Sequence, residues 1–466
     1  MTARVSLSPA FFLELEALLG DRLSRSPYDL ESHARDESWH EAAPPDAVAF
    51  VESNDEAAAV VRVCAAHGVP IIPFGAGTAV EGHVQALYGG VSLDLSRMKR
   101  ILEIYTDDLD CRVQAGVTRK QLNQELEKHG LMFPVDPGAD ATLGGMAATG
   151  ASGTTAVRYG TMRENVLGMT VVTADGEVIR TGGRARKSSA GYDLTRLMVG
   201  SEGTLGVITE LQLRLRPLPE AVSSAVCAFA TLEGAVASVV EILQSGIPAA
   251  RCELLDATAI DAVNRHSKLD YALQPTLFFE FHGTPDGVAE QARMAGEIAR
   301  EHGGEEFRWS ARREDRERLW EARHKAYYAM KALQPGAQGW ATDVAVPISR
   351  LAECILQTVA DCEAHGLLAP ILGHVGDGNF HVTFLFQPDD FETMRRVKAA
   401  NLRLVEHALA LGGTSTGEHG VGSGKIWAVE AEHGAAITVM RSIKRALDPK
   451  GIMNPGKVLR MPAEET

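Results

Sequence analysis

Residues 143–153 read Leu-Gly-Gly-Met-Ala-Ala-Thr-Gly-Ala-Ser-Gly, and this stretch decides the fold more than any other. So many small residues in a row cannot form a hydrophobic core of their own. Their backbone is accessible, however, and it suits a wall against which a flat or extended ligand lies. Pro137-Gly138 precedes the stretch, and Arg158-Tyr159-Gly160 follows it. We therefore expect a ligand-binding wall at this place in the chain.

Two further glycine-rich segments flank the first. Residues 73–78, Pro-Phe-Gly-Ala-Gly-Thr, follow a strand-like run, and glycines there would let backbone N–H groups approach phosphate oxygens. Residues 199–209, Val-Gly-Ser-Glu-Gly-Thr-Leu-Gly-Val-Ile-Thr, form a glycine-rich loop that runs into a strand. Each segment alone also fits a plain structural turn. Three of them within one domain favour a binding site.

The segment at residues 73–78 does not match the Rossmann dinucleotide fingerprint. That pattern, G-x-G-x-x-G at the start of a helix, would need glycine at Val80 and an acidic residue about 20 positions further on. We therefore exclude a Rossmann nucleotide site.

The composition is that of an ordinary globular protein. The 466 residues are 45% hydrophobic and 23% charged, which allows two or three packed domains. A net charge of -15 disfavours a non-specific hold on nucleic acid, and no window has the roughly 18 consecutive apolar residues of a membrane helix. The first twenty residues lack the pattern of a targeting signal. We expect a small-molecule partner, no transmembrane segment and a cytoplasmic location, with peripheral attachment to the inner membrane left open.

The six cysteines are scattered, without a Cys-x-x-Cys pair or an iron–sulfur spacing. We interpret them as reduced structural thiols. Redox chemistry would then require a bound organic cofactor, or a metal held by histidine and carboxylate ligands.

The pattern of predicted strands and helices changes once along the chain, which indicates two domains. From Val48 to Pro219 strand-like and helical runs alternate, which predicts an α/β domain. After Pro219 the order of strands and helices, with helices over residues 232–244 and 286–302, predicts helices on one face of an antiparallel sheet. A last helix is expected around residues 435–447, where Asp448-Pro449-Lys450-Gly451 ends it.

A histidine pair flanks a turn signal at residues 372–383. If Asp377 and Gly378 are the two turn residues of a hairpin, His374 faces His381, and paired residues share a face of the sheet. Two imidazoles in that arrangement can converge on one divalent ion. A pair of structural histidines fits the hairpin equally well.

A carboxylate and a third imidazole occur together in Gly417-Glu418-His419-Gly420. Neighbours in an extended segment point to opposite sides, so one of the two can bind an ion while the other faces elsewhere. Either residue is a candidate for a third ligand.

Taken in order, these segments resemble the FAD-binding vanillyl-alcohol oxidase and para-cresol methylhydroxylase family, in which a loop like residues 73–78 holds a pyrophosphate. The resemblance is strongest to D-lactate dehydrogenase (cytochrome) and related D-2-hydroxy acid dehydrogenases. The motifs that carry it are KSSAGYDL at 187–194, VGSEGTLG at 199–206, GHVGDGNFH at 373–381 and TGEHGVGSGK at 416–425. It continues to Asn454-Pro455-Gly456-Lys457 and so covers nearly the whole chain.

The resemblance implies an α+β fold, with a two-subdomain FAD-binding domain of the vanillyl-alcohol oxidase type and an α+β cap domain with an antiparallel sheet. Applied to this chain, it predicts a FAD-binding domain at 1–219, in which N-terminal helices precede two α/β subdomains. A substrate and cap domain with the metal site is expected at 220–425. A C-terminal segment at 426–466 is expected to return to the FAD domain.

The resemblance also implies that FAD is bound without a covalent link. His83 is the nearby candidate for such a link, but its setting does not look like a linking motif. Many members of the family have Asn where this chain has Gly150, so the side-chain contact to the flavin expected there is absent. The residues expected to bind FAD are Pro73, Phe74, Gly75, Ala76, Gly77, Thr78, Pro137, Gly138, Thr142, Gly144, Gly145, Ala148, Thr149, Ser152, Gly153, Tyr159, Glu202, Gly203, Gly206, Val207, Ile208 and Asn454.

A divalent metal is implied by the same branch of the family, in which both histidines of the GHxGDGNxH motif and the glutamate of GEHG are ligands and the adjacent histidine is the base. Carried over, His374, His381 and Glu418 bind the metal, and His419 is the catalytic base. Zn²⁺ is the first expectation, with Mn²⁺ or Fe²⁺ as alternatives. Such an ion would lower the pKa of a substrate hydroxyl, whose proton a neutral histidine accepts.

The substrate carboxylate requires a cation. Arg323, in the helical run at residues 319–324, resembles the arginine that binds a carboxylate in this family. A planar guanidinium suits two-pronged capture. The alternative is an ordinary surface arginine on a charged helix.

The expected reaction is FAD-dependent oxidation of a D-2-hydroxy acid, with D-lactate first, to the 2-oxo acid by hydride transfer. Hydroxyglutarate-specific relatives usually have a lysine before the Tyr-Asp pair that corresponds to Thr342-Asp343, whereas this chain has Trp340-Ala341. That difference favours a monocarboxylate with an apolar tail. Oxidation of D-2-hydroxyglutarate or glycolate is the alternative.

Two other functional classes fit the sequence less well. A lipid-ether synthase on the same fold has adjacent histidines in place of Glu418-His419, so it is disfavoured. A flavin-binding protein without catalysis is disfavoured by the intact motifs. The chain has no haem attachment or iron–sulfur motif, so a separate cytochrome, quinone or electron-transfer protein is expected to accept the electrons. A homodimer is left open.

Overall fold

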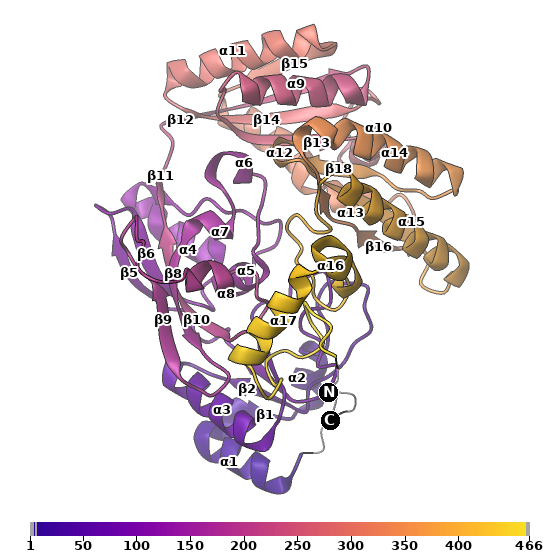
Figure 1. The fold of residues 1–466 in the computed structure, drawn as a ribbon. Helices are drawn as coiled ribbons and strands as arrows, with labels where there is room; N and C mark the ends of the chain where they lie inside the picture. Colours follow the sequence, from indigo (N-terminus) through magenta and orange to yellow (C-terminus); the bar gives the residue numbers. More distant parts are fainter. Residues whose placement is uncertain (1–3, 5–6, 463–466) are drawn as a thin grey trace. The chain divides into compact units, whose positions relative to one another are not determined.

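The structure is a computed structural model that describes Arg4 and residues 7–462 (Figure 1). It divides into two compact units. Unit 1 comprises Met1–Ser152, Gly160–Leu218 and Glu418–Thr466, and unit 2 comprises Gly153–Tyr159 and Pro219–Gly417.

The first sheet of unit 1 is small and mostly parallel. Its strand order is β1-β2-β4-β3, and β2, β4 and β3 run parallel while β1 is antiparallel to β2. The strands are β1 (Leu23–Ser24), β2 (Ala47–Phe50), β3 (Ile71–Phe74) and β4 (Val91–Asp94). The helices of this part are α1 (Pro9–Leu19), η1 (Gly20–Arg22), α2 (Pro27–Ser32) and α3 (Asn54–His67).

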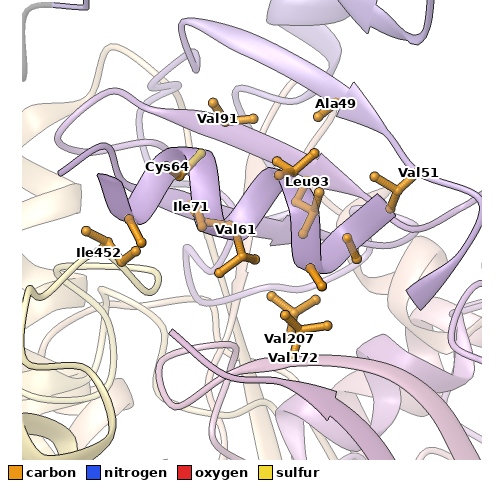
Figure 2. Packing of buried hydrophobic residues seen from close by; sticks show 14 of the residues in the cluster. Ala49, Val51, Val61, Cys64, Ile71, Val91, Leu93, Val172, Val207 and Ile452 are labelled. Carbon is orange, nitrogen blue, oxygen red and sulfur yellow. The ribbon is translucent and has the colours of Figure 1, made fainter. Parts of the chain in front are cut away.

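Helix α3 packs its apolar face against this sheet (Figure 2). The same buried cluster contains side chains of the strands and two valines of the neighbouring sheet, so the two sheets of unit 1 share part of their core. Figure 2 labels, among others, Val61, Cys64, Leu93, Val172 and Val207.

The second sheet of unit 1 is antiparallel, with the order β5-β6-β10-β8-β9. Its strands are β5 (Ile101–Tyr105), β6 (Asp110–Gln114), β8 (Val166–Val172), β9 (Val178–Gly182) and β10 (Val207–Arg214). The prediction of an α/β domain up to Pro219 is therefore wrong for this half. Short turns join β5 to β6 and β8 to β9, and strands joined by short turns pair antiparallel.

Short elements complete unit 1. They are α4 (Arg119–Leu126), η2 (Glu127–His129), α5 (Leu143–Thr149), α7 (Met162–Asn165) and α8 (Leu194–Met198), with β7 (Leu131–Met132) paired to β11 (Arg216–Pro217).

The last segment of the chain lies beside β3. It contains α16 (Ile426–His433) and α17 (Ala436–Leu447), and the second helix confirms the one predicted around residues 435–447. Beyond α17, the Ile71 amide donates to the carbonyl of Ile452 at 2.8 Å, and the Asn454 amide donates to the carbonyl of Ile71 at 2.8 Å. This pairing places Asn454 next to the strand that leads into residues 73–78.

Unit 2 is built on one large antiparallel sheet with the order β15-β12-β14-β13-β18-β19-β16, and β17 also pairs with β19. Its strands are β12 (Ala221–Phe229), β13 (Ala249–Leu255), β14 (Thr276–Gly283), β15 (Gly304–Ser310), β16 (Gln338–Ala341), β17 (Val344–Ala345), β18 (Ile371–His374) and β19 (Asn379–Phe386). Its helical segments are α6 (Ala156–Tyr159), α9 (Leu232–Gln244), α10 (Ala257–Ser267), α11 (Pro285–Glu301), α12 (Arg313–His324), α13 (Ala326–Lys331), η3 (Ile348–Arg350), α14 (Leu351–Ala364), η4 (Val375–Asp377) and α15 (Phe391–Ala410).

Helices cover both faces of this sheet, so the prediction of helices on one face is wrong. Ser223 and Ser224 are neighbours on β12 and point to opposite faces. The Ser223 hydroxyl donates to a carbonyl of α11 at 3.4 Å, whereas the Ser224 hydroxyl accepts from Trp320 Nε1 of α12 at 2.9 Å. Because both faces are covered, β14 and β19 are buried along nearly their whole length.

Two properties of the chain follow from the described residues. None of their helices is both long and apolar enough to cross a bilayer. The six cysteines are all described, and all are buried and free.

Candidate functional site

The three glycine-rich segments of the sequence meet in unit 1. A Cβ added to Gly75 would lie 2.3 Å from Thr142 Oγ1, and one added to Gly203 would lie 2.8 Å from the ring of Pro73. The Glu202 amide donates to the carbonyl of Ala148 at 2.8 Å. These approaches are too close for side chains, which explains the small residues. Residues 73–78, 142–152 and 199–209 therefore form one backbone-lined surface.

The backbone of this surface contains unusual conformations. Gly150 ends α5 with a φ of 67°, in the left-handed region that glycine adopts readily and asparagine tolerates. Glu202 and Asn454 have φ values of 53° and 38° although neither is glycine. Such conformations persist where the surrounding structure holds them, and they are common at functional sites.

Glu202, His83 and Asn454 form a cluster of buried polar side chains beside the glycine-rich surface. Hydrogen bonds within and around this cluster fix the backbone of Glu202 and Asn454. Glu202 accepts hydrogen bonds from the amides of Val421 and Gly422 at 2.6 and 2.8 Å, and His83 Nε2 lies 3.3 Å from its carboxylate. Asn454 Nδ2 donates to the carbonyl of Glu202 at 2.8 Å and to that of His83 at 3.2 Å.

Glu202 and His83 shift each other's pKa. Burial alone would raise the pKa of Glu202, but His83 and the two amides outweigh it and hold the pKa below its usual value. Burial would lower the pKa of His83, but Glu202 and, further away, Asp36 and Glu81 raise it. Glu202 and His83 thus each favour the charged form of the other.

The residues of this surface fit FAD, an extended ligand with a pyrophosphate and a polar ring edge. Besides the exposed backbone, Ser201 Oγ and Asn454 Oδ1 are buried without a hydrogen-bond partner among the described residues. Buried polar atoms are nearly always satisfied in a functional protein, so a bound ligand would account for them. Ser201 was missed by the sequence analysis although it lies within the third glycine-rich segment. A Cβ added to Gly138, in contrast, would meet nothing within 4 Å, so close packing does not explain this glycine.

Gly153 and Tyr159 belong to unit 2, whereas the other residues expected to bind FAD belong to unit 1. The Tyr159 hydroxyl lies 2.7 Å from His282 Nδ1, and His282 Nε2 donates to Glu280 at 2.9 Å. Glu280 in turn pairs with Arg251 at 3.3 Å. Tyr159 is thus fixed by a buried polar chain in unit 2.

The histidine hairpin has a different register from the predicted one. His374 pairs with Asn379, and His381 pairs with Leu372. The turn holds four residues, because Val375–Asp377 form a short 3₁₀ helix and Gly378 follows with a φ of 74°. A two-residue turn at Asp377-Gly378 is therefore ruled out.

The two histidines nevertheless share a face of the sheet, since His381 is the diagonal neighbour of His374. Their ring centroids are 5.3 Å apart, and one ring nitrogen of each lies within 4.8 Å of the other. His381 Nδ1 donates to the carbonyl of Thr342 at 2.9 Å, and His374 Nδ1 donates to Glu253 Oε1 at 2.8 Å. With Nδ1 engaged in both rings, Nε2 is the nitrogen that suits a metal.

Arg323 is a buried residue, which excludes the surface alternative. It lies on α12 with 8% of its surface exposed, whereas Arg312, Arg313 and Arg318 of the same segment are exposed. Its Nε and Nη2 atoms lie 2.9 and 2.6 Å from Glu253 Oε2. Glu253 was not identified from the sequence, where an acidic residue within a strand carries no motif.

Asp343 is a second residue that sequence analysis missed as a site residue. Its Oδ1 atom lies 3.7 Å from His381 Nδ1 and accepts a hydrogen bond from Asn379 at 2.8 Å. The Thr416 hydroxyl donates to its other oxygen at 2.7 Å. Asp343 therefore fixes both the hairpin and the strand-like segment that ends at Gly417.

Glu418 and His419 follow directly on that segment. A Cβ added to Gly417 would lie 2.4 Å from Asn379 Nδ2, so the chain reaches the hairpin up to this residue. The boundary between the units falls after Gly417, and Glu418 and His419 begin the last part of unit 1. A peptide bond keeps the Cα atom of Glu418 about 3.8 Å from that of Gly417.

Known proteins agree with this architecture. A family model described as "FAD binding domain" matches residues 45–182, and one described as "FAD linked oxidases, C-terminal domain" matches residues 218–458, which is more than half of the chain. The chain is also similar to 4-ethylphenol oxidase from Gulosibacter chungangensis, with a TM-score of 0.81 at 20% identity over 99% of both chains. A structure of p-cresol methylhydroxylase matches with a TM-score of 0.78 at 18% identity over 98% of both chains. These likenesses confirm the predicted fold.

Three relatives cover most of the chain. A probable mitochondrial D-lactate dehydrogenase from Danio rerio is 52% identical over 94% of this chain and 88% of its own length. The mitochondrial D-lactate dehydrogenase [cytochrome] from Arabidopsis thaliana is 43% identical over 96% of this chain and 79% of its own. A glycolate oxidase subunit from Bacillus subtilis is 34% identical over 90% of both. This chain therefore belongs to the family of FAD-linked oxidases, and the two relatives above that are named D-lactate dehydrogenase are 52% and 43% identical to it.

Proposed function

We propose that this chain is a FAD-dependent dehydrogenase that oxidises a D-2-hydroxy acid, D-lactate, to the 2-oxo acid with the help of a divalent metal. The names of the relatives at 52% and 43% identity support the reaction. The observation that carries the proposal is the buried group in unit 2 that combines the guanidinium of Arg323 with the imidazoles of His374 and His381. A cation and two metal-binding side chains are what a 2-hydroxy carboxylate requires.

FAD would be held by the glycine-rich surface of unit 1, with Glu202 and Asn454 shaping its polar side. Bound FAD would supply the two-electron acceptor that oxidation of an alcohol requires. His83, the candidate for a covalent link, has its Nε2 atom 3.3 Å from the carboxylate of Glu202, which argues against a link through this residue. We therefore propose that the cofactor is bound without a covalent link.

A divalent metal would be held by His374, His381 and Glu418. Two neutral imidazoles and one carboxylate suit Zn²⁺, and they also suit Mn²⁺ or Fe²⁺. Such an ion would lower the pKa of the substrate hydroxyl. The support for Glu418 is its place one residue beyond Gly417, which contacts the hairpin.

Arg323 would bind the substrate carboxylate, and His419 would accept the hydroxyl proton. A neutral imidazole is suited to take up a proton near neutral pH. The buried position of Arg323 supports its role, because a guanidinium in a water-poor site binds a carboxylate more strongly than one on the surface.

The substrate is proposed to be a monocarboxylate with a small apolar tail. Trp340 and Ala341 end β16, opposite Phe384 and Thr383 of β19, and neither offers the cation that a second carboxylate would need. Glycolate is the second candidate, because the Bacillus subtilis relative is named a glycolate oxidase subunit.

The electrons are proposed to pass to a separate acceptor, and the bracketed word in the name of the Arabidopsis relative favours a cytochrome. A quinone or an electron-transfer protein is the alternative. The cytoplasmic location stays a prediction, and the names of the two most identical of these relatives place those proteins in mitochondria. A homodimer also stays a prediction.

The proposal is tested by mixing the purified holoenzyme without air with D-lactate, L-lactate, glycolate or D-2-hydroxyglutarate in a stopped-flow instrument. D-lactate should bleach the flavin fastest, and L-lactate should leave it oxidised. Faster bleaching by glycolate would assign the second candidate. No bleaching by any of the four acids would refute the proposed reaction class.

A further inference from the structure

A single buried carboxylate, that of Glu253, joins two residues to which the proposed function gives different tasks. Glu253 lies in β13 and is fully buried. The register between β13 and β18 pairs Leu254 with Gly373, which brings Glu253 opposite His374 on the neighbouring strand. The same face of the sheet carries α12 and Arg323. Glu253 therefore sits between a strand residue and a helix residue.

We propose that Glu253 is a positioning residue that fixes the metal-binding orientation of His374 and the substrate-binding orientation of Arg323 at the same time. Its Oε1 atom accepts from His374 Nδ1 at 2.8 Å, its Oε2 atom accepts from Arg323 Nε at 2.9 Å, and the same oxygen lies 2.6 Å from Arg323 Nη2 in an ion pair. This inference rests on the proposed function.

The contact with His374 fixes the ring. An ionised carboxylate can only accept hydrogen bonds, so Nδ1 must carry the ring proton and Nε2 must keep its lone pair. Carboxylates that hold the second nitrogen of a metal-binding histidine orient the ring and raise its basicity. Glu253 thus selects the tautomer that can bind an ion through Nε2.

The contact with Arg323 decides which edge of the guanidinium is left for substrate. The edge formed by Nε and Nη2 faces Glu253, with Nε donating to Oε2 and Nη2 2.6 Å from the same oxygen, so a substrate carboxylate cannot approach along that edge. The remaining two-pronged edge is formed by Nη1 and Nη2. Arg323 therefore offers its Nη1–Nη2 edge to the substrate, and Glu253 sets the direction in which this edge points.

A purely structural role for Glu253 would require only one of these contacts. Arg323 is buried and needs a counter-charge, and the ion pair supplies it. That need does not account for the hydrogen bond from His374 to the other carboxylate oxygen. The two contacts can be separated by mutation, because Arg323 can be made neutral while His374 keeps its partner.

The test compares the wild type, Glu253→Gln, Arg323→Met and the double variant Glu253→Gln/Arg323→Met. Glu241→Gln is the matched control, because Glu241 makes the same kind of carboxylate–imidazole contact, with His302 at 2.6 Å, on α9 of the same unit. Each holoenzyme is stripped of metal, and its affinity for Zn²⁺ is measured by competition with a chromogenic chelator. Thermal unfolding and the KM for D-lactate are measured on the same preparations.

We expect Glu253→Gln to weaken Zn²⁺ binding by about 10–100-fold and to raise KM. Arg323→Met should raise KM while its Zn²⁺ affinity stays within about twofold of the wild type. Glu253→Gln leaves the buried guanidinium of Arg323 without a counter-charge. The double variant removes that guanidinium as well, so it should fold even if Glu253→Gln alone does not. Its Zn²⁺ affinity should stay about 10–100-fold low. Glu241→Gln should match the wild type in both constants.

Wild-type Zn²⁺ affinity in Glu253→Gln or in the double variant would overturn the inference and leave the proposed metal site intact. A loss of Zn²⁺ affinity in Arg323→Met as large as that in Glu253→Gln would also overturn it. The loss would then come from breaking the ion pair between Glu253 and Arg323, and not from losing the hydrogen bond to His374. A wild type that takes up neither Zn²⁺ nor Mn²⁺ nor Fe²⁺ would overturn the metal site of the proposed function, and this inference with it.

Discussion

Replacing Gly75 by alanine should destabilise unit 1 and weaken FAD binding, because it introduces a single methyl group where two glycine-rich segments touch. The added Cβ would lie 2.3 Å from Thr142 Oγ1, while the next atoms, Thr142 Cβ and Cγ2, are at ordinary distances of 3.5 and 3.7 Å. The conflict therefore involves one hydroxyl oxygen.

The size of the effect follows from what Thr142 can do. Its hydroxyl accepts from the Gly145 amide at 3.3 Å as the N-cap of α5. Rotating the hydroxyl away from the added methyl group would give up that cap, at about 0.5–2 kcal/mol. Keeping it in place would overpack the contact, at about 1–3 kcal/mol. We expect the cheaper response, a loss of about 1–2 kcal/mol, which changes an equilibrium constant by about 5–30-fold.

The assay is a double-mutant cycle of wild type, Gly75→Ala, Thr142→Ala and the double variant, with urea unfolding and FAD titration as measurements. In the Thr142→Ala background the oxygen is gone and the nearest remaining atom lies 3.5 Å away, so Gly75→Ala should then cost almost nothing. The coupling energy should be about 1–2 kcal/mol. Gly183→Ala is the control, since nothing lies within 4 Å of its added Cβ. Equal costs of Gly75→Ala in both backgrounds would refute the contact between the two segments.

Four further predictions test the proposed cofactor, metal, carboxylate site and base. Acid precipitation should leave the flavin in the supernatant, and a yellow pellet would show a covalent link. His374→Ala and His381→Ala should each abolish turnover and lower the metal content while the flavin spectrum is kept, and full metal occupancy in both would contradict their role as ligands. Arg323→Lys should raise KM about tenfold or more, because a point charge replaces a two-pronged contact, and an unchanged KM would exclude contact with substrate. His419→Asn should keep FAD and metal but slow flavin reduction by about 10²–10⁴-fold and remove its dependence on a group that titrates near neutral pH, and loss of metal would make His419 a ligand instead of the base.

Local signals in the sequence located most of the elements that carry the site. Helix α9 was predicted at its observed bounds, since a capping residue and an apolar period are properties of a short stretch of chain. The glycine-rich segments were identified because a lack of side chains is visible in the sequence itself. Arg323 and the histidines were found through motifs that the family shares.

Register was beyond the reach of the sequence. Asp377-Gly378 is a good signal for a two-residue turn, yet Val375–Asp377 form a 3₁₀ helix and shift the pairing of His374 to Asn379. A Cβ added to Gly376 would lie 2.7 Å from Val157, so this turn packs against the distant α6. A turn type that depends on such a contact has no local signature.

The sequence by itself determined that this chain has a glycine-lined surface, a pair of histidines on one hairpin and a second domain built on an antiparallel sheet, because each of these depends on residues a few positions apart. Only the tertiary structure decided that Gly75 meets Thr142, that helices cover both faces of the large sheet, and that Glu253 holds His374 and Arg323. Glu253 and His374 are 121 positions apart in the chain. The pairing of β13 with β18 brings these two residues together. Which strands pair depends on all the strands of the sheet, and no local sequence pattern encodes it.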